Sequence, residues 1–180
     1  TYAYIVRLSR LLKEKFFDTP IVVGSNIASA AETLLKNSPV DFVVHGEGEE
    51  TFLELYEKII RNEPRNFNEI KGISFLDEQN NYCETLARPV MRDLSLFGLP
   101  DLDLIDLNVY LPDIKVYRAN FYHDHRVRMV LKSNPRVNRR VMGLEFSRGC
   151  PNACSFCYRH FVGCRRMPVE TALDWLEQII

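Results

Sequence analysis

The order of apolar and polar positions predicts an α/β chain. Apolar side chains recur at helical spacing over residues 4–17. Two short apolar runs without alternation, residues 20–24 and 41–45, are typical of fully buried strands that end at glycine turns. Helical patterns follow both runs, one over residues 28–35 and one after the turn at residues 46–49. The apolar positions of the second are Phe52, Leu53, Leu55, Tyr56, Ile59 and Ile60. A strand–helix–strand–helix order with such strands predicts parallel α/β winding.

The rest of the chain has a different pattern. Residues 72–76 and 82–85, separated by a polar turn, predict a small β-hairpin. Residues 86–114 are rich in Pro, Leu and Asp without a sustained period, which predicts an ordered connector. An apolar run at 141–146 predicts another buried strand before a cysteine loop, and residues 168–180 predict a helix that starts with proline.

These patterns divide the chain into three parts. Residues 1–64 form the strand-and-helix domain, residues 65–140 a connector with the hairpin and a basic segment, and residues 141–180 a strand–loop–helix unit. The chain begins at Thr1 and ends at Ile180 within an apolar helical pattern, so we expect a fragment of a longer protein. No apolar run approaches the roughly 20 residues of a membrane span. No signal peptide is visible either, and we expect a cytoplasmic protein.

Charge is unevenly distributed along the chain, although the net charge is −1. Residues 1–114 carry eleven Lys or Arg against nineteen Asp or Glu, whereas residues 115–166 carry twelve against two. The basic stretch suggests an anionic partner or ligand, of which nucleic acid is one option. Attraction between the two oppositely charged parts, or simple solvation of the arginines, accounts for it equally well.

Four of the five cysteines lie within fifteen residues, and only Cys83 lies upstream of them. Such clustering predicts ligation of a metal or cluster in a reducing compartment, because a disulfide framework would spread an even number along the chain. Cys150, Cys154 and Cys157 form a C-x3-C-x2-C motif. Three thiolates on a 4Fe–4S cluster leave one iron open, and catalysis requires an open metal position.

The alternative is a structural zinc ion. Cys164 or His160 would then be its fourth ligand, but the chain has no second C-x2-C pair, which is the usual zinc pattern.

The cysteine motif has an aromatic residue before its last cysteine and follows the sequence Ser-Arg-Gly. It resembles the radical S-adenosylmethionine superfamily. The resemblance implies that Cys150, Cys154 and Cys157 hold a 4Fe–4S cluster whose open iron chelates S-adenosylmethionine. Reductive cleavage would then yield a 5′-deoxyadenosyl radical, with electrons from an external donor such as flavodoxin or ferredoxin. Phe156 is implied to pack near the adenine, although an ordinary core aromatic is the other interpretation. Residues 141–180 would start a TIM-like partial barrel.

The glycine turns after the first two apolar runs resemble the second half of cobalamin-binding domains attached to radical S-adenosylmethionine enzymes. The resemblance implies the C-terminal half of a Rossmann-like parallel-sheet domain, although structural turn glycines of any α/β domain are the general alternative. Serine stands where the family usually has its second glycine, and no histidine lies in an Asp-x-His-x-x-Gly motif, so no cobalt ligand is assigned. The residues implied to contact cobalamin are Gly24, Ser25, Gly46, Glu47 and Gly48.

Three functions compete on this evidence. The leading hypothesis is a cobalamin-associated radical S-adenosylmethionine enzyme that performs methyl transfer, cyclisation or rearrangement on an unknown substrate, such as a small molecule. The second is a radical S-adenosylmethionine methylthiotransferase acting on tRNA or protein, which would need more upstream cysteines than Cys83. The third is a non-catalytic zinc or nucleic-acid binding module, for which the chain offers no second ligand pair.

Overall fold

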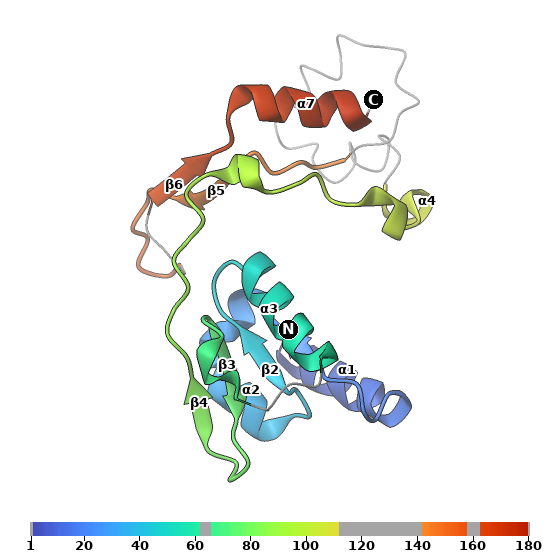
Figure 1. Ribbon diagram of the computed structural model, residues 1–180, viewed down its shortest axis with the longest axis vertical. Helices are drawn as coiled ribbons and strands as arrows, with labels where there is room; N and C mark the ends of the chain where they lie inside the picture. The colour runs from blue at the N-terminus through green and yellow to red at the C-terminus, as the bar shows by residue number, and fades with distance from the viewer. Residues whose placement is uncertain (1, 62–65, 112–141, 158–162, 180) are drawn as a thin grey trace. The chain divides into compact units, whose positions relative to one another are not determined.

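The computed structural model describes residues 2–61, 66–111, 142–157 and 163–179 (Figure 1). The chain divides into two compact units, residues 1–92 with 149–164 and residues 93–148 with 165–180. Within the described ranges, no helix combines the length and apolar character that crossing a bilayer requires. The helices are α1 (Tyr2–Lys15), α2 (Ala31–Asn37), α3 (Glu49–Ile60), α4 (Leu107–Tyr110) and α7 (Val169–Ile179). The strands are β1 (Val22–Val23), β2 (Phe42–Val44), β3 (Ile73–Leu76), β4 (Tyr82–Glu84), β5 (Ser147–Cys150) and β6 (Gly163–Arg166).

The first unit is built on a four-stranded sheet in the order β1-β2-β3-β4. β1 and β2 are parallel, with Val22 opposite Phe42. β3 pairs with β2 in the antiparallel direction, and β4 closes the predicted hairpin. The predicted parallel winding is therefore correct for β1 and β2, but the complete sheet is mixed. The hairpin, which we had placed in a connector beginning at residue 65, continues the sheet.

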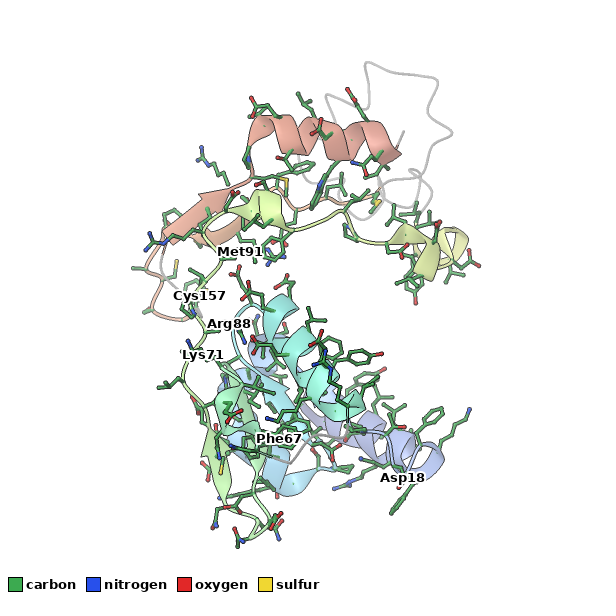
Figure 2. All side chains as sticks on the ribbon, in the orientation of Figure 1. Asp18, Phe67, Lys71, Arg88, Met91 and Cys157 are labelled. Atoms are coloured by element: carbon green, nitrogen blue, oxygen red, sulfur yellow. The ribbon has the colours of Figure 1, made fainter. Side chains whose placement is uncertain are left out.

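Two apolar clusters cover the two faces of this sheet. On one face, α1 and α2 pack over Val43, with Leu34 fully buried between them. On the other face, Leu55 of α3 packs with Phe42 and Ile73. Phe67 extends this second cluster, its ring lying edge-on to Phe42 with centroids 4.7 Å apart (Figure 2). Both faces are therefore occupied, as α/β folding requires.

Three details of the predicted elements differ from the structure. The strand expected at 20–24 is only half-buried, because β1 is the edge of the described sheet and has a partner on one side alone. The helix expected from residue 28 begins earlier, as a 3-10 helix over Ser25–Ala30 that leads into α2. In α3, Phe52 and Tyr56 remain exposed although the periodicity places them with the apolar face.

The strand predicted at 141–146 is wrong. Residues 142–146 are not in a strand, and β5 begins at Ser147 because its ladder partner is β6, on the far side of the cysteine loop. β6 consists of Gly-Cys-Arg-Arg, which no apolar pattern marks as a strand. The predicted helix that follows is confirmed as α7. Most of the basic segment, together with His160, lies outside the described residues.

A candidate ligand edge and a cysteine loop

The predicted cobalamin-contacting residues gather at one edge of the sheet. β1 and β2 run in parallel, so Gly24 and Ser25 after β1 lie at the same end as the turn after β2. A Cβ atom added to Gly24 would lie 3.6 Å from the carbonyl oxygen of Val44, so the two segments are in van der Waals contact. Ligands of open α/β sheets bind at this carboxyl end of the strands.

Two residues at this edge have left-handed backbone conformations. Gly46 has a φ of 69°, and a Cβ atom added there would meet no atom within 4 Å. Ser25 has a φ of 71°, a region that residues other than glycine rarely adopt. The serine at the position of the family's second glycine thus keeps a glycine-like backbone, and the space beside Gly46 is open.

Glu47 has a structural partner. Its carboxylate oxygen Oε2 accepts a hydrogen bond of 3.0 Å from the backbone N–H of Met91, which lies beyond the hairpin (Figure 2). The next residue, Gly48, packs within 3.5 Å of Val44 at the position of its absent Cβ and immediately precedes α3. Glu47 therefore holds the turn to the segment after β4, whereas its ligand contact stays a prediction.

Arg88 fixes the start of α3 beside this turn (Figure 2). Its Nε donates a 2.8 Å hydrogen bond to Oγ1 of Thr51, and its other nitrogens pair with the carboxylates of Glu50 and Glu54. The hydroxyl of fully buried Thr51 donates in turn to the carbonyl oxygen of Lys71, at 3.1 Å. The sequence analysis missed Arg88 and Thr51, because their partners are more than fifteen residues away along the chain.

Four polar side chains form a hydrogen-bonded series on the α2-facing side of the sheet. Nε2 of His45 lies 2.6 Å from Oγ of Ser74, which lies 2.9 Å from the hydroxyl of Tyr82. That hydroxyl donates to the carboxylate of Glu84, at 2.6 Å. Partial burial and the bond to Glu84 raise the pKa of the Tyr82 phenol. One signal was available in the sequence, a serine within the apolar run of β3.

The C-x3-C-x2-C motif lies on an exposed loop. Cys150 ends β5 and is half-buried, whereas Cys154 and Cys157 are exposed. A backbone hydrogen bond of 3.2 Å from the N–H of Cys157 to the carbonyl oxygen of Cys154 closes a tight turn. No disulfide joins any of the five cysteines, all of which the structure describes. Across the described ranges, no three His, Cys, Asp or Glu side chains converge closely enough to hold a metal ion.

The side chains around the motif differ in their packing. Phe156 is 90% exposed, so its ring packs into no apolar core among the described residues. Arg148, two residues before Cys150, places its guanidinium 4.1 Å from the centroid of the Phe97 ring, in the range of a cation–π contact. The backbone N–H of Met167 donates to the carbonyl oxygen of Phe146, at 2.8 Å, and so joins the segments before and after the loop.

Comparison with known proteins gives a consistent result. No protein-family model matches the chain. It is 28% identical over 156 residues to an anaerobic magnesium-protoporphyrin IX monomethyl ester cyclase of Synechocystis, covering 85% of the chain and 26% of the relative. It is 30% identical over 154 residues to the enzyme of the same name from Cereibacter sphaeroides, covering 82% and 21%. The chain thus spans about a quarter of the length of these relatives.

A solved structure is similar as well. The cobalamin-dependent S-adenosylmethionine radical enzyme OxsB, with aqua-cobalamin and S-adenosylmethionine bound, matches with a TM-score of 0.57 and 26% identity. The match covers 88% of this chain and 18% of that one. Over most of its length, the chain is therefore similar in sequence to one part of the anaerobic cyclases, and in sequence and fold to one part of the cobalamin-dependent S-adenosylmethionine radical enzyme OxsB. This confirms the resemblance to radical S-adenosylmethionine enzymes with a cobalamin-binding-type domain.

Proposed function

We propose that the protein is a cobalamin-associated radical S-adenosylmethionine enzyme, and that Cys150, Cys154 and Cys157 hold its 4Fe–4S cluster. The observation that carries the proposal is the C-x3-C-x2-C motif in a chain that resembles OxsB over 88% of its length. Held by these three thiolates, the cluster would supply the reductive cleavage of S-adenosylmethionine to methionine and a 5′-deoxyadenosyl radical.

The residue types and exposure of the loop suit this donor set, although the three thiols do not converge in the described structure. Cys154 and Cys157 are exposed thiols three residues apart, and their turn is closed by a backbone hydrogen bond. Gly149 precedes the first ligand with a φ of 96°, a conformation that favours glycine. The exposed ring of Phe156 is accessible to an adenine. Arg148, stacked on Phe97, anchors the strand from which the loop leaves.

The edge formed by Gly24, Ser25, Gly46, Glu47 and Gly48 is the proposed cobalamin site. The fit rests on two features of the turns: the empty space at the Cβ position of Gly46 and the left-handed backbone of Ser25. The open space at Gly46 lets a ligand approach the main chain closely, and the left-handed backbone of Ser25 has the conformation of a glycine turn. We propose the same family's architecture for the fold. Residues 1–64 are the C-terminal half of a Rossmann-like domain, which the hairpin extends, and residues 141–180 begin a partial barrel.

For the reaction, we propose a carbon-centred transformation of a small molecule. Cyclisation is supported by the two relatives that are named as cyclases, and methyl transfer and rearrangement remain the other options of this class. The electron donor would be an external flavodoxin or ferredoxin in the cytoplasm. A methylthiotransferase would need a second, cysteine-bound cluster upstream, but Cys83 packs with the apolar cluster under α3.

Anaerobic reconstitution with iron and sulfide tests the proposal. We expect about four irons per protein, a broad absorbance in the visible range that oxygen bleaches, and formation of 5′-deoxyadenosine from S-adenosylmethionine after reduction. Cys154→Ala should lose the absorbance and the product. Cys164→Ala, an exposed cysteine outside the motif, is the matched control and should retain both. A colourless protein that binds one zinc ion would refute the proposal.

A further inference from the structure

The four hydrogen-bonded side chains of Glu84, Tyr82, Ser74 and His45 lie side by side on one face of the sheet. They run from the exposed edge strand β4, across β3, to the end of β2 at the ligand edge. Glu84 is exposed, Tyr82 is half-buried and Ser74 is fully buried. His45 follows β2 directly, and its backbone N–H is held by the carbonyl oxygen of Gly72, at 2.8 Å. A buried serine hydroxyl needs partners, and here it has one on each side.

Donor and acceptor rules give this series one direction. A carboxylate only accepts hydrogen bonds, so the Tyr82 hydroxyl donates its one hydrogen bond to Glu84. The oxygen of Tyr82 must then accept from the Ser74 hydroxyl, whose only proton is used in that bond. Ser74 Oγ is left as an acceptor, and the group 2.6 Å away, Nε2 of His45, must carry a proton. The raised pKa of Tyr82 keeps its phenol protonated, which this order requires.

His45 lies within the candidate ligand edge. It joins Val44, which the Gly24 turn contacts, to Gly46, whose Cβ position is open. The imidazole is on the same face of the sheet as Ser74, so its bond to Ser74 fixes the residue between these two turns. The orientation of the Gly46 turn thus depends on a hydrogen bond whose direction is set by the exposed carboxylate of Glu84, on the edge strand β4.

On the basis of the proposed cobalamin site, we propose that Glu84, Tyr82 and Ser74 hold the imidazole of His45 with its proton on Nε2, and that His45 is a positioning residue of that site. The ligand concerned is the cobalamin proposed for the edge that includes the Gly24 and Gly46 turns. His45 acts through the conformation of its own turn.

The protonated nitrogen can be observed directly. In protein labelled with ¹⁵N-histidine, the ring-nitrogen shifts of His45, assigned by their disappearance in His45→Gln, should show a proton on Nε2. Tyr82→Phe frees the Ser74 hydroxyl to donate, so the His45 proton should move towards Nδ1. Tyr56→Phe, on the exposed face of α3, should leave the shifts unchanged. A proton on Nδ1 in the wild type, or shifts that Tyr82→Phe does not move, would overturn the proposal.

Cobalamin affinity provides the second measurement, by titration with hydroxocobalamin and absorbance. The side-chain amide of glutamine places an N–H near the position of Nε2, whereas that of asparagine reaches only the position of Nδ1. His45→Gln should therefore bind within about twofold of wild type, and His45→Asn about fivefold more weakly, as expected for one lost hydrogen bond.

Equal affinities of these two variants would contradict the positioning role. A wild-type protein without affinity for hydroxocobalamin would instead refute the proposed site, and with it the ligand role of His45, while the position of the proton would still be decided by the NMR measurement.

Discussion

Gly46→Ala is the sharpest test of the proposed ligand edge. The backbone at Gly46 has a φ of 69°, and an added methyl group would meet nothing within 4 Å. The substitution therefore introduces left-handed strain without a clash, and it should lower the free energy of unfolding by about 1 kcal/mol. If a ligand lies against this turn, the methyl group occupies its space. An overpacked contact costs about 2 kcal/mol, or about thirtyfold in the dissociation constant of cobalamin.

Gly98→Ala is the matched control. Gly98 lies outside the proposed site, its φ is not in the left-handed region, and a methyl group there would meet no atom within 4 Å. We expect its stability and its affinity to stay near those of wild type. Urea unfolding followed by circular dichroism gives the first quantity, and titration with hydroxocobalamin gives the second. If Gly46→Ala binds cobalamin as well as Gly98→Ala does, the Gly46 turn does not face the ligand and the reasoning fails.

Three further predictions concern stability. Leu55→Ala should lower the free energy of unfolding by about 3 kcal/mol, because the side chain is fully buried under α3, whereas exposed Leu53→Ala should cost little; equal losses in urea unfolding would contradict the assigned core. Ser25→Gly relieves left-handed strain but adds conformational freedom to the unfolded chain, so it should change the free energy of unfolding by less than about 0.5 kcal/mol. Ser29 has no such strain to relieve, so a loss for Ser25→Gly as large as that for Ser29→Gly would argue against the assigned backbone. Hydrogen bonds from Asn81 lower the pKa of Asp77 below its ordinary 3.8, so its stabilising contribution is present above that value and is lost as the pH falls through the lower, folded-state pKa. The melting temperature of Asp77→Ala should accordingly fall below that of wild type at neutral pH and converge with it in acid, and a gap that persists in acid would contradict this.

Local sequence determined most of the elements. The apolar runs and helical periodicities located β2, α3, α7 and the hairpin to within a few residues, because burial on both faces or on one face leaves a periodic trace. The C-x3-C-x2-C motif was also informative, because its proposed chemistry depends on the spacing of three cysteines within eight residues. The glycine turns were also placed correctly, because each closes a strand that the sequence marks.

The tertiary structure decided what depends on distant partners. The hairpin joins the sheet because Phe42 lies opposite Phe75, a pairing that local periodicity does not specify. β5 and β6 form because each supplies the backbone hydrogen-bond partners of the other, although neither has an apolar pattern. The series from Glu84 to His45 spans 39 positions along the chain, yet consecutive members are within hydrogen-bond distance. Sequence periodicity records which faces are buried, whereas hydrogen-bond partners are chosen only when the strands align side by side.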